Sequence, residues 1–259
     1  MKCIFCKQSS EASRSVEHIV PESLGNKCQV LPPGVVCDSC NNYFSRKVER
    51  RVLDSGYFHS LRFTQGVSSK RNKIPTQKAV MMPTIPVELI KERDGTNVVK
   101  VPSEFWESVT TQENGRILFP VTGPKPDNKL MSRFIAKVAF EAFAQRLISK
   151  PNLLEEMIND EQLDPIKQWA RYGRSKEKWL FYERRIYDRN KRHTSEIGEN
   201  YQVVYEYDFL MTPASEMYFC IAIFGKEFTI NMGGPSIDGY KQWLLENDNK
   251  SPLYVGGGL

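Results

Sequence analysis

The sequence predicts an α+β fold, in which a small metal-stabilised N-terminal finger precedes a larger mixed domain. Two Cys-x-x-Cys pairs within the first forty residues, followed directly by a helical pattern, predict the finger. One long apolar helical pattern and several later runs of β-forming residues predict the larger domain. We expect the finger at residues 1–65, a linker at 66–78, and an α+β domain at 79–259 that serves substrate recognition or regulation.

The finger is expected to contain short strands and one helix. Residues 2–6 are predicted to form a strand and a tight turn, and residues 16–20 a second strand that ends at Pro21. A helix is predicted from Asn41 or Asn42 to Leu53, where Ser55-Gly56 stops it. Its apolar side chains recur every four residues: Phe44, Val48 and Val52.

The larger domain is expected to begin after a polar, basic segment at residues 66–78. Short β-like runs occupy residues 79–122, and a wide apolar face predicts a long helix at 130–148. Two shorter helices at 152–172 and a closing helix at 237–246 are also predicted. Strands are predicted at 179–187, 201–211, 217–224 and 227–232. A tight hairpin is expected at Gly225-Lys226.

Positive charge is concentrated in the N-terminal part. The net charge of the chain is +5, and residues 1–75 hold 12 Lys and Arg against 6 Asp and Glu. This asymmetry favours a polyanionic partner. No apolar run approaches the roughly 18 residues needed to cross a bilayer, and the first residues lack an apolar signal segment. We therefore expect a cytoplasmic protein with no membrane partner.

The four paired cysteines predict a structural zinc site. Cys3, Cys6, Cys37 and Cys40 offer four soft ligands, which is the set that a tetrahedral zinc ion needs. All four positions would be filled, so this zinc would have no open position for a reactive water. A redox role is the alternative for either pair taken alone. Cys28 and Cys220 are left over, and Cys28 is expected to serve as a packing residue, because a fifth thiolate exceeds a tetrahedral zinc site.

Two segments resemble a known family. The sequence around the first predicted strand reads Val16-Glu17-His18-Ile19-Val20-Pro21-Glu22-Ser23-Leu24-Gly25, and the second cysteine pair reads Cys37-Asp38-Ser39-Cys40-Asn41. Together they resemble HNH endonucleases with zinc knuckles around a ββα-metal finger, over about the first 55 residues. The resemblance implies a nuclease acting in a setting such as bacterial defence or a mobile element.

The resemblance also implies the catalytic residues. His18 matches the general base that takes a proton from the attacking water. Glu17 and Asn41 match the two ligands of a catalytic divalent ion, although most members have Asp where this chain has Glu17. Carboxylate and amide oxygens are hard donors that suit Mg²⁺ or Mn²⁺. A histidine with a pKa near 6.5 can accept a proton at neutral pH.

Two positions depart from the family pattern. Ser45 stands where some members have a further histidine ligand. The middle Asn of the motif, which fixes the loop before the second knuckle, should lie near position 32, where this chain has Pro32. Asn26 is the alternative candidate for that role.

The expected substrate is DNA. Arg46 and Arg50, and likewise Lys47 and Arg51, lie four residues apart on the polar side of the predicted helix, where they could contact phosphates or simply face solvent. One finger would nick one strand, so cutting both strands would require a homodimer or two successive cleavage events. Cleavage of RNA and a non-catalytic zinc module that binds nucleic acid or protein are the alternatives.

Overall fold

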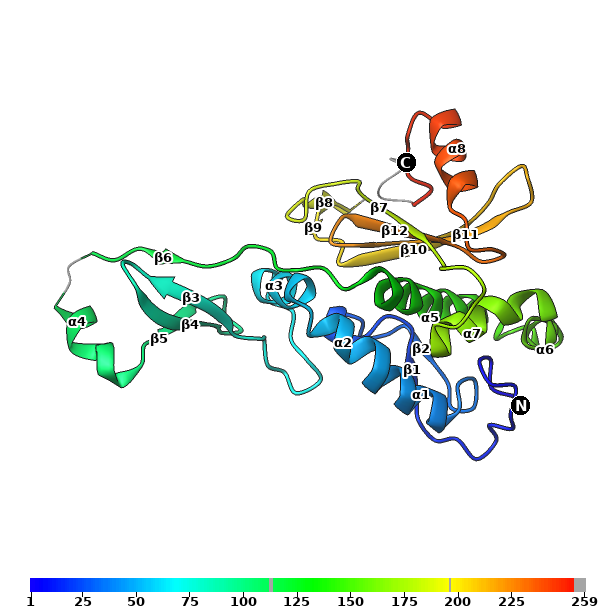
Figure 1. Ribbon diagram of the computed structural model, residues 1–259, viewed down its shortest axis with the longest axis horizontal. Helices are drawn as coiled ribbons and strands as arrows, with labels where there is room; N and C mark the ends of the chain where they lie inside the picture. The colour runs from blue at the N-terminus through cyan, green and yellow to red at the C-terminus, as the bar shows by residue number, and fades with distance from the viewer. Residues whose placement is uncertain (112–113, 196, 254–259) are drawn as a thin grey trace. The chain divides into compact units, whose positions relative to one another are not determined.

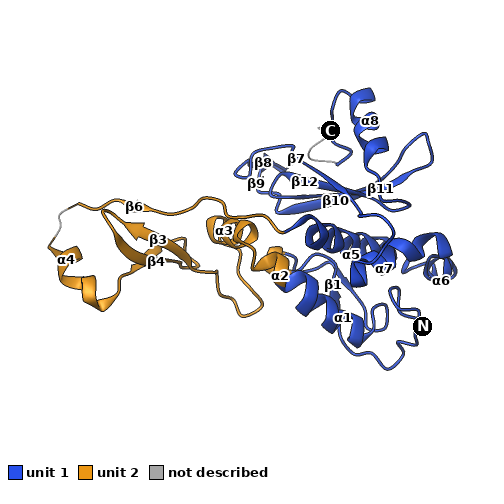
Figure 2. Ribbon diagram, viewed as in Figure 1, with its two compact units in different colours: residues 1–21, 26–50, 127–259 blue, residues 22–25, 51–126 orange. Residues whose placement is uncertain are grey.

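The computed structural model describes all residues except 112–113, 196 and 254–259, and its elements confirm the α+β class (Figure 1). The chain forms two compact units (Figure 2): unit 1 comprises residues 1–21, 26–50 and 127–259, and unit 2 comprises 22–25 and 51–126. The chain thus leaves unit 1 after its N-terminal motif and returns to it at Asp127. These units group the residues differently from the limits expected at 65 and 79, which remain a prediction about separable parts.

Residues 17–53 form a short hairpin followed by a helix, and residues 22–25 and 51–53 of this segment belong to unit 2. β1 (Glu17–His18) pairs antiparallel with β2 (Val30–Leu31), and the 3-10 turn η1 (Glu22–Leu24) lies between them in the chain. The helix runs through α1 (Asp38–Phe44), the π-helical η2 (Ser45–Glu49) and α2 (Arg50–Leu53). It begins three residues before the predicted start, because the Cys37 sulfur accepts a hydrogen bond from the Cys40 amide and caps it.

Helix α5 (Asn128–Leu147) is the centre of unit 1. Its N-terminus is capped by the Asp127 side chain, which accepts a hydrogen bond from the Leu130 amide at 2.8 Å. Its residues 130–142 are all buried. On one side the Phe140 ring lies 6.0 Å from Phe5 of the N-terminal segment, and on another the Phe143 ring lies 5.5 Å from Phe209 of the C-terminal sheet. The helix is therefore covered all round rather than on one face.

A four-stranded antiparallel sheet in the order β10-β11-β12-β7 packs against α5 (Figure 1). Its strands are β7 (Phe181–Arg185), β10 (Tyr205–Met211), β11 (Met217–Ile223) and β12 (Lys226–Asn231). Tyr218, Cys220 and Ala222 of β11 share a core with α8 (Asp238–Glu246), while Phe219 contacts Phe209 at 5.2 Å. The central strand is thus buried on both faces, which explains its unbroken apolar sequence.

The hairpin between β11 and β12 turns one residue earlier than expected. Ile223 pairs with Lys226, so the loop residues are Phe224 and Gly225, both with positive φ (46° and 72°). That geometry is the type I′ turn that suits the twist of a hairpin. A Cβ atom on Gly225 would lie 2.3 Å from the Tyr187 carbonyl oxygen, so the position requires glycine.

The remaining elements of unit 1 complete its helical layer and one small ribbon. They are α6 (Pro151–Asn159), η4 (Glu161–Leu163), α7 (Asp164–Tyr172), and the ribbon of β8 (His193–Thr194) and β9 (Asn200–Tyr201). The predicted pair of helices at 152–172 and the closing helix at 237–246 are confirmed.

Unit 2 contains helices and a second antiparallel sheet in the order β5-β4-β3-β6. Its elements are α3 (Gly56–Gln65), β3 (Gln77–Met81), β4 (Ile85–Lys91), β5 (Asn97–Lys100), η3 (Ser103–Phe105), α4 (Trp106–Thr110) and β6 (Ile117–Leu118). Phe63 of α3 packs with alternate residues of β3 and β4, such as Ala79 and Val87. In the described part of the chain, none of the helices combines the length and apolarity that crossing a membrane requires.

Candidate active site and metal centre

The four predicted cysteine ligands converge in a zinc-knuckle arrangement. The sulfur atoms of Cys3, Cys6, Cys37 and Cys40 all lie within 4.8 Å of one another, and those of Cys6 and Cys37 are 3.7 Å apart. A zinc tetrahedron with Zn–S bonds of ~2.3 Å has S–S edges of about 3.8 Å. The donor set and its size therefore fit zinc.

The cysteine cluster is held together by its own backbone. The Cys37 amide donates to the Cys3 sulfur at 3.3 Å, and the Cys40 amide donates to the Cys37 sulfur at 3.4 Å. A hydrogen bond from Cys40 lowers the pKa of Cys3 to about 4, and the same contact raises the pKa of Cys40 well above its ordinary value. Cys220 is buried, whereas Cys28 is exposed, so the expectation that Cys28 serves as a packing residue is wrong.

Glu17 and His18 lie side by side in β1 and have different surroundings. Glu17 is 5% exposed, whereas His18 is only partly buried. Their strand pairs with β2 through Leu31 and Val30. Because successive side chains of a strand point to opposite faces, the two groups occupy opposite sides of the hairpin.

The Glu17 carboxylate faces a buried lysine from α5. The Lys137 Nζ atom lies 2.6 Å from Glu17, 2.6 Å from Glu49 and 2.8 Å from Glu141, and it donates a hydrogen bond to the His18 carbonyl oxygen at 3.1 Å. The Lys137 and Glu141 side chains are both fully buried. Three carboxyl groups therefore share one ammonium group directly beneath the Glu17-His18 pair.

The charge balance of this cluster is visible in the pKa shifts. Burial lowers the pKa of Lys137, but the three neighbouring carboxylates outweigh it and raise that pKa well above its ordinary value. Burial raises the pKa of Glu141 well above its ordinary value, despite Lys137. The Glu141 Oε1 atom is buried without a hydrogen-bond partner among the described residues. An excess of carboxyl groups over ammonium groups favours an additional proton or cation nearby.

Asn41 lies in the first turns of α1, immediately after the last cysteine. It is partly buried, and its Nδ2 atom lies 3.4 Å from the carbonyl oxygen of Val16, the residue before Glu17. The helix thus brings Asn41 to the start of the strand that carries Glu17. A carboxylate has two oxygens and about four acceptor positions, so Glu17 could contact Lys137 and a metal ion together. A carboxylate and an amide oxygen suit a hard divalent ion.

Asn26 holds the loop between β1 and β2. It is fully buried, its Nδ2 atom donates to the carbonyl oxygens of Val20 at 2.8 Å and Gln29 at 2.7 Å, and its Oδ1 atom accepts from the Cys28 and Gln29 amides. The Tyr205 hydroxyl also donates to Oδ1, at 3.0 Å. Every polar position of this amide is used.

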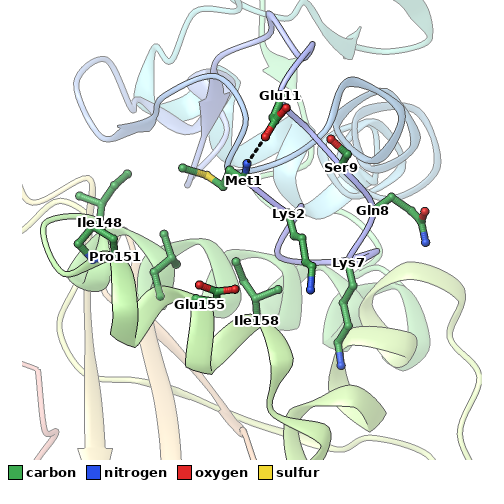
Figure 3. Close-up of a pocket in the computed structure, with 11 residues that line it drawn as sticks. Met1, Lys2, Lys7, Gln8, Ser9, Glu11, Ile148, Pro151, Glu155 and Ile158 are labelled. Atoms are coloured by element: carbon green, nitrogen blue, oxygen red, sulfur yellow. Dashed lines mark hydrogen bonds and ion pairs between the residues drawn. The ribbon is translucent and has the colours of Figure 1, made fainter.

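The four basic residues of the finger helix are all exposed: Arg46, Lys47, Arg50 and Arg51. Ser45 is exposed as well. Unit 1 also contains a pocket of about 600 Å³ (Figure 3), and none of these exposed residues lines it. It is lined by apolar residues such as Leu154 and Ile158 and by polar ones such as Lys2 and Glu11, and none of the candidate catalytic residues lines it.

Sequence reasoning missed Lys137, Glu49 and Glu141. A signal was present, because Lys137 and Glu141 are four residues apart inside an otherwise apolar helical run. Charged residues in such a run are rarely buried unless they are paired. The sequence of the helix alone does not indicate which residues of the finger these side chains contact.

The comparisons with known proteins agree with the N-terminal motif. The family model described as HNH endonuclease matches residues 3–55. No curated protein and no solved structure matches the chain. The match covers the knuckles, the hairpin and the finger helix, and it indicates nuclease activity on nucleic acid in general terms.

Proposed function

Since residues 3–55 carry the HNH endonuclease motif, we propose that this protein is a metal-dependent endonuclease that hydrolyses phosphodiester bonds of DNA. The observation that carries the proposal is the convergence of three motif parts in one unit. The Glu17-His18 strand, the Asn41 helix and the four-cysteine cluster all belong to unit 1. A module that only bound nucleic acid would not need a histidine, a carboxylate and an amide together.

In this proposal His18 is the general base. Its imidazole takes a proton from the water that attacks phosphorus, which requires the neutral form and suits a group that titrates near neutral pH. Glu17 and Asn41 would hold a divalent ion, Mg²⁺ or Mn²⁺, which when bound stabilises negative charge on the phosphate and on the leaving oxygen. His18 and Glu17 act from opposite faces of β1, so base and metal ligand approach the phosphate from different sides.

The surrounding residues position the substrate and the loop. Arg46, Lys47, Arg50 and Arg51 are proposed to contact phosphates through their exposed side chains. Asn26 is proposed to take the role of the middle Asn of the motif, because its hydrogen bonds hold the ends of the β1–β2 loop together. Zinc at the cysteine cluster is proposed to be structural.

The test is cleavage of supercoiled plasmid by the wild type and by His18→Ala, with Mg²⁺, with Mn²⁺ and with EDTA. Loss of a general base should reduce the rate by ~10²–10⁴, while zinc content stays the same. His59→Ala is the matched control, since His59 lies in α3 of unit 2 and its Nε2 contacts the Thr76 carbonyl at 2.7 Å. Its activity should stay within about twofold of the wild type.

The outcomes separate the alternatives. Metal-dependent nicking that His18→Ala abolishes supports the proposal, and linear product formed without a nicked intermediate would indicate a homodimer. Cleavage of RNA alone would replace DNA by RNA as the substrate. A zinc-loaded wild type that binds nucleic acid but cuts neither would favour a binding module, and equal activity of both proteins would refute the role of His18.

A further inference from the structure

A buried ammonium group from the C-terminal part of unit 1 contacts both halves of the catalytic dipeptide. We propose that Lys137 is a positioning residue that fixes Glu17 and His18 for catalysis. This inference rests on the proposed nuclease function and deepens it. It assigns a catalytic contribution to α5, which lies outside the residues that match the family model.

The first argument is the geometry around β1. Lys137 Nζ contacts the Glu17 side chain at 2.6 Å and the backbone carbonyl of His18 at 3.1 Å. One contact fixes the carboxylate, and the other fixes the peptide plane after the histidine. Because β1 is only two residues long, its own pairing constrains it weakly, and the ammonium group supplies an anchor. The direction of the imidazole on the opposite face is thereby set.

The second argument is that Lys137 joins the two elements of the site. Glu49, 2.6 Å from Nζ, lies in η2, which continues the helix that begins with α1 and carries Asn41. The ammonium group therefore connects the strand that bears Glu17 and His18 to the helix that bears Asn41. A shift of either element would stretch a contact shorter than 3 Å.

The third argument is electrostatic. Carboxylates that bind metal ions are held by further charged or hydrogen-bonding partners, and loss of such a partner typically costs 10–100-fold in metal affinity or activity. Glu17 is nearly buried, and Lys137 is its cationic partner in a place where an unpaired carboxylate is costly. Without Lys137, the Glu17 carboxylate would lie beside Glu49 and Glu141 with no compensating charge, and it would lose the contact that fixes its position.

The test compares Lys137→Met with Lys167→Met. Lys167 is a matched control, because it is also a buried lysine of unit 1, 1% exposed, with its Nζ bonded to the Ile158 carbonyl at 2.9 Å and to Asp164 at 3.2 Å. Both variants lose a buried ammonium group and should lose thermal stability. Zinc content, the Kd for Mn²⁺ measured by electron paramagnetic resonance, and kcat and KM on plasmid are then measured at a temperature at which both are folded.

We expect Lys137→Met to keep its zinc, to bind Mn²⁺ ten- to 100-fold more weakly and to lose a similar factor in kcat with little change in KM. Lys167→Met should bind Mn²⁺ and cut DNA as the wild type does. Wild-type Mn²⁺ affinity and kcat in a folded Lys137→Met protein would overturn the inference and leave the nuclease proposal standing. A wild type that neither binds Mn²⁺ nor cuts any nucleic acid would overturn both.

A second variant covers the case in which Lys137→Met does not fold. Lys137→Met combined with Glu141→Met replaces the two fully buried charged side chains by apolar ones of similar length, which often restores stability. It leaves Glu17 and Glu49 in place without their ammonium partner. The same loss of Mn²⁺ affinity is expected in this folded protein, and unchanged affinity would count against the role of Lys137.

Discussion

Replacing Asn26 by Asp should destabilise the β1–β2 loop, although the two side chains have almost the same shape. The Asn26 Nδ2 atom donates to the Val20 and Gln29 carbonyl oxygens, and the side chain is fully buried. A carboxylate oxygen in its place cannot donate, so two carbonyl groups lose their partners and face a negative charge. Each such loss costs roughly 1–3 kcal/mol. The three hydrogen bonds accepted by Oδ1 are kept, so we expect a net loss of about 2–4 kcal/mol.

The assay is urea unfolding followed by tryptophan fluorescence and circular dichroism, with the free energy extrapolated to water. Asn152→Asp is the control, because Asn152 is exposed in the first turn of α6, and its change should stay within about 0.5 kcal/mol. If Asn26→Asp is as stable as that control, the loop does not depend on these hydrogen bonds and the reasoning fails. Plasmid nicking at a temperature where the variant is folded should also fall, since the loop directly follows β1, which bears Glu17 and His18.

Three further predictions concern metal, salt and pH. Cys37→Ser should abolish stoichiometric zinc binding, measured by plasma mass spectrometry. It should also make residues 1–50 sensitive to limited proteolysis, because structural zinc contributes folding energy. Retained zinc with unchanged resistance to proteolysis would contradict this prediction. If the Arg46 side chain neutralises one phosphate, Arg46→Gln should reduce the slope of the logarithm of the DNA-binding constant against the logarithm of the salt concentration by about 0.9. Fluorescence anisotropy on duplex DNA measures this slope. An unchanged slope would show that Arg46 does not contact a phosphate. Burial alone would raise the pKa of Asp164, but hydrogen bonds from Lys7 and Lys167 lower this pKa below its ordinary value of 3.8. The ionised carboxylate therefore stabilises the fold above that pH, and this stabilisation is lost as the pH falls below it. The stability advantage of the wild type over Asp164→Asn in thermal melts should therefore vanish in strong acid, and an advantage that grows in acid would show the opposite shift.

The parts of the fold that were predicted correctly are those with local signals. Each Cys-x-x-Cys pair, the four-residue apolar repeat after the second pair and the long apolar run of α5 lie within about twenty residues of sequence. The zinc-knuckle arrangement and the helix at 128–147 follow from those signals. The hairpin at Phe224-Gly225 was found to within one residue, because glycine marks the turn and the flanking strands mark the register.

The parts that were missed depend on long-range contacts. Lys137 meets the His18 carbonyl across 119 positions of sequence, and a single lysine in an apolar helix does not indicate which carboxylate it faces. Cys28 was expected to pack, but it is exposed, and its backbone amide donates a hydrogen bond to the Asn26 side chain. The grouping of residues 127–259 with the N-terminal motif has the same origin, since it depends on contacts such as that of Phe5 with Phe140, which are far apart in the sequence.

The return of the chain to unit 1 at Asp127 also has a consequence for synthesis on the ribosome. The zinc ligands are complete once Cys40 has emerged, and Lys137 emerges about 5–19 s later, because 97 residues separate the two and synthesis adds ~5–20 residues per second. During that interval the finger can bind zinc, while its aromatic surface and the Glu17 carboxylate still lack their partners from α5. Assembly of the Glu17-His18 site is therefore a late event in synthesis, and the length of the segment that interrupts unit 1 sets the delay.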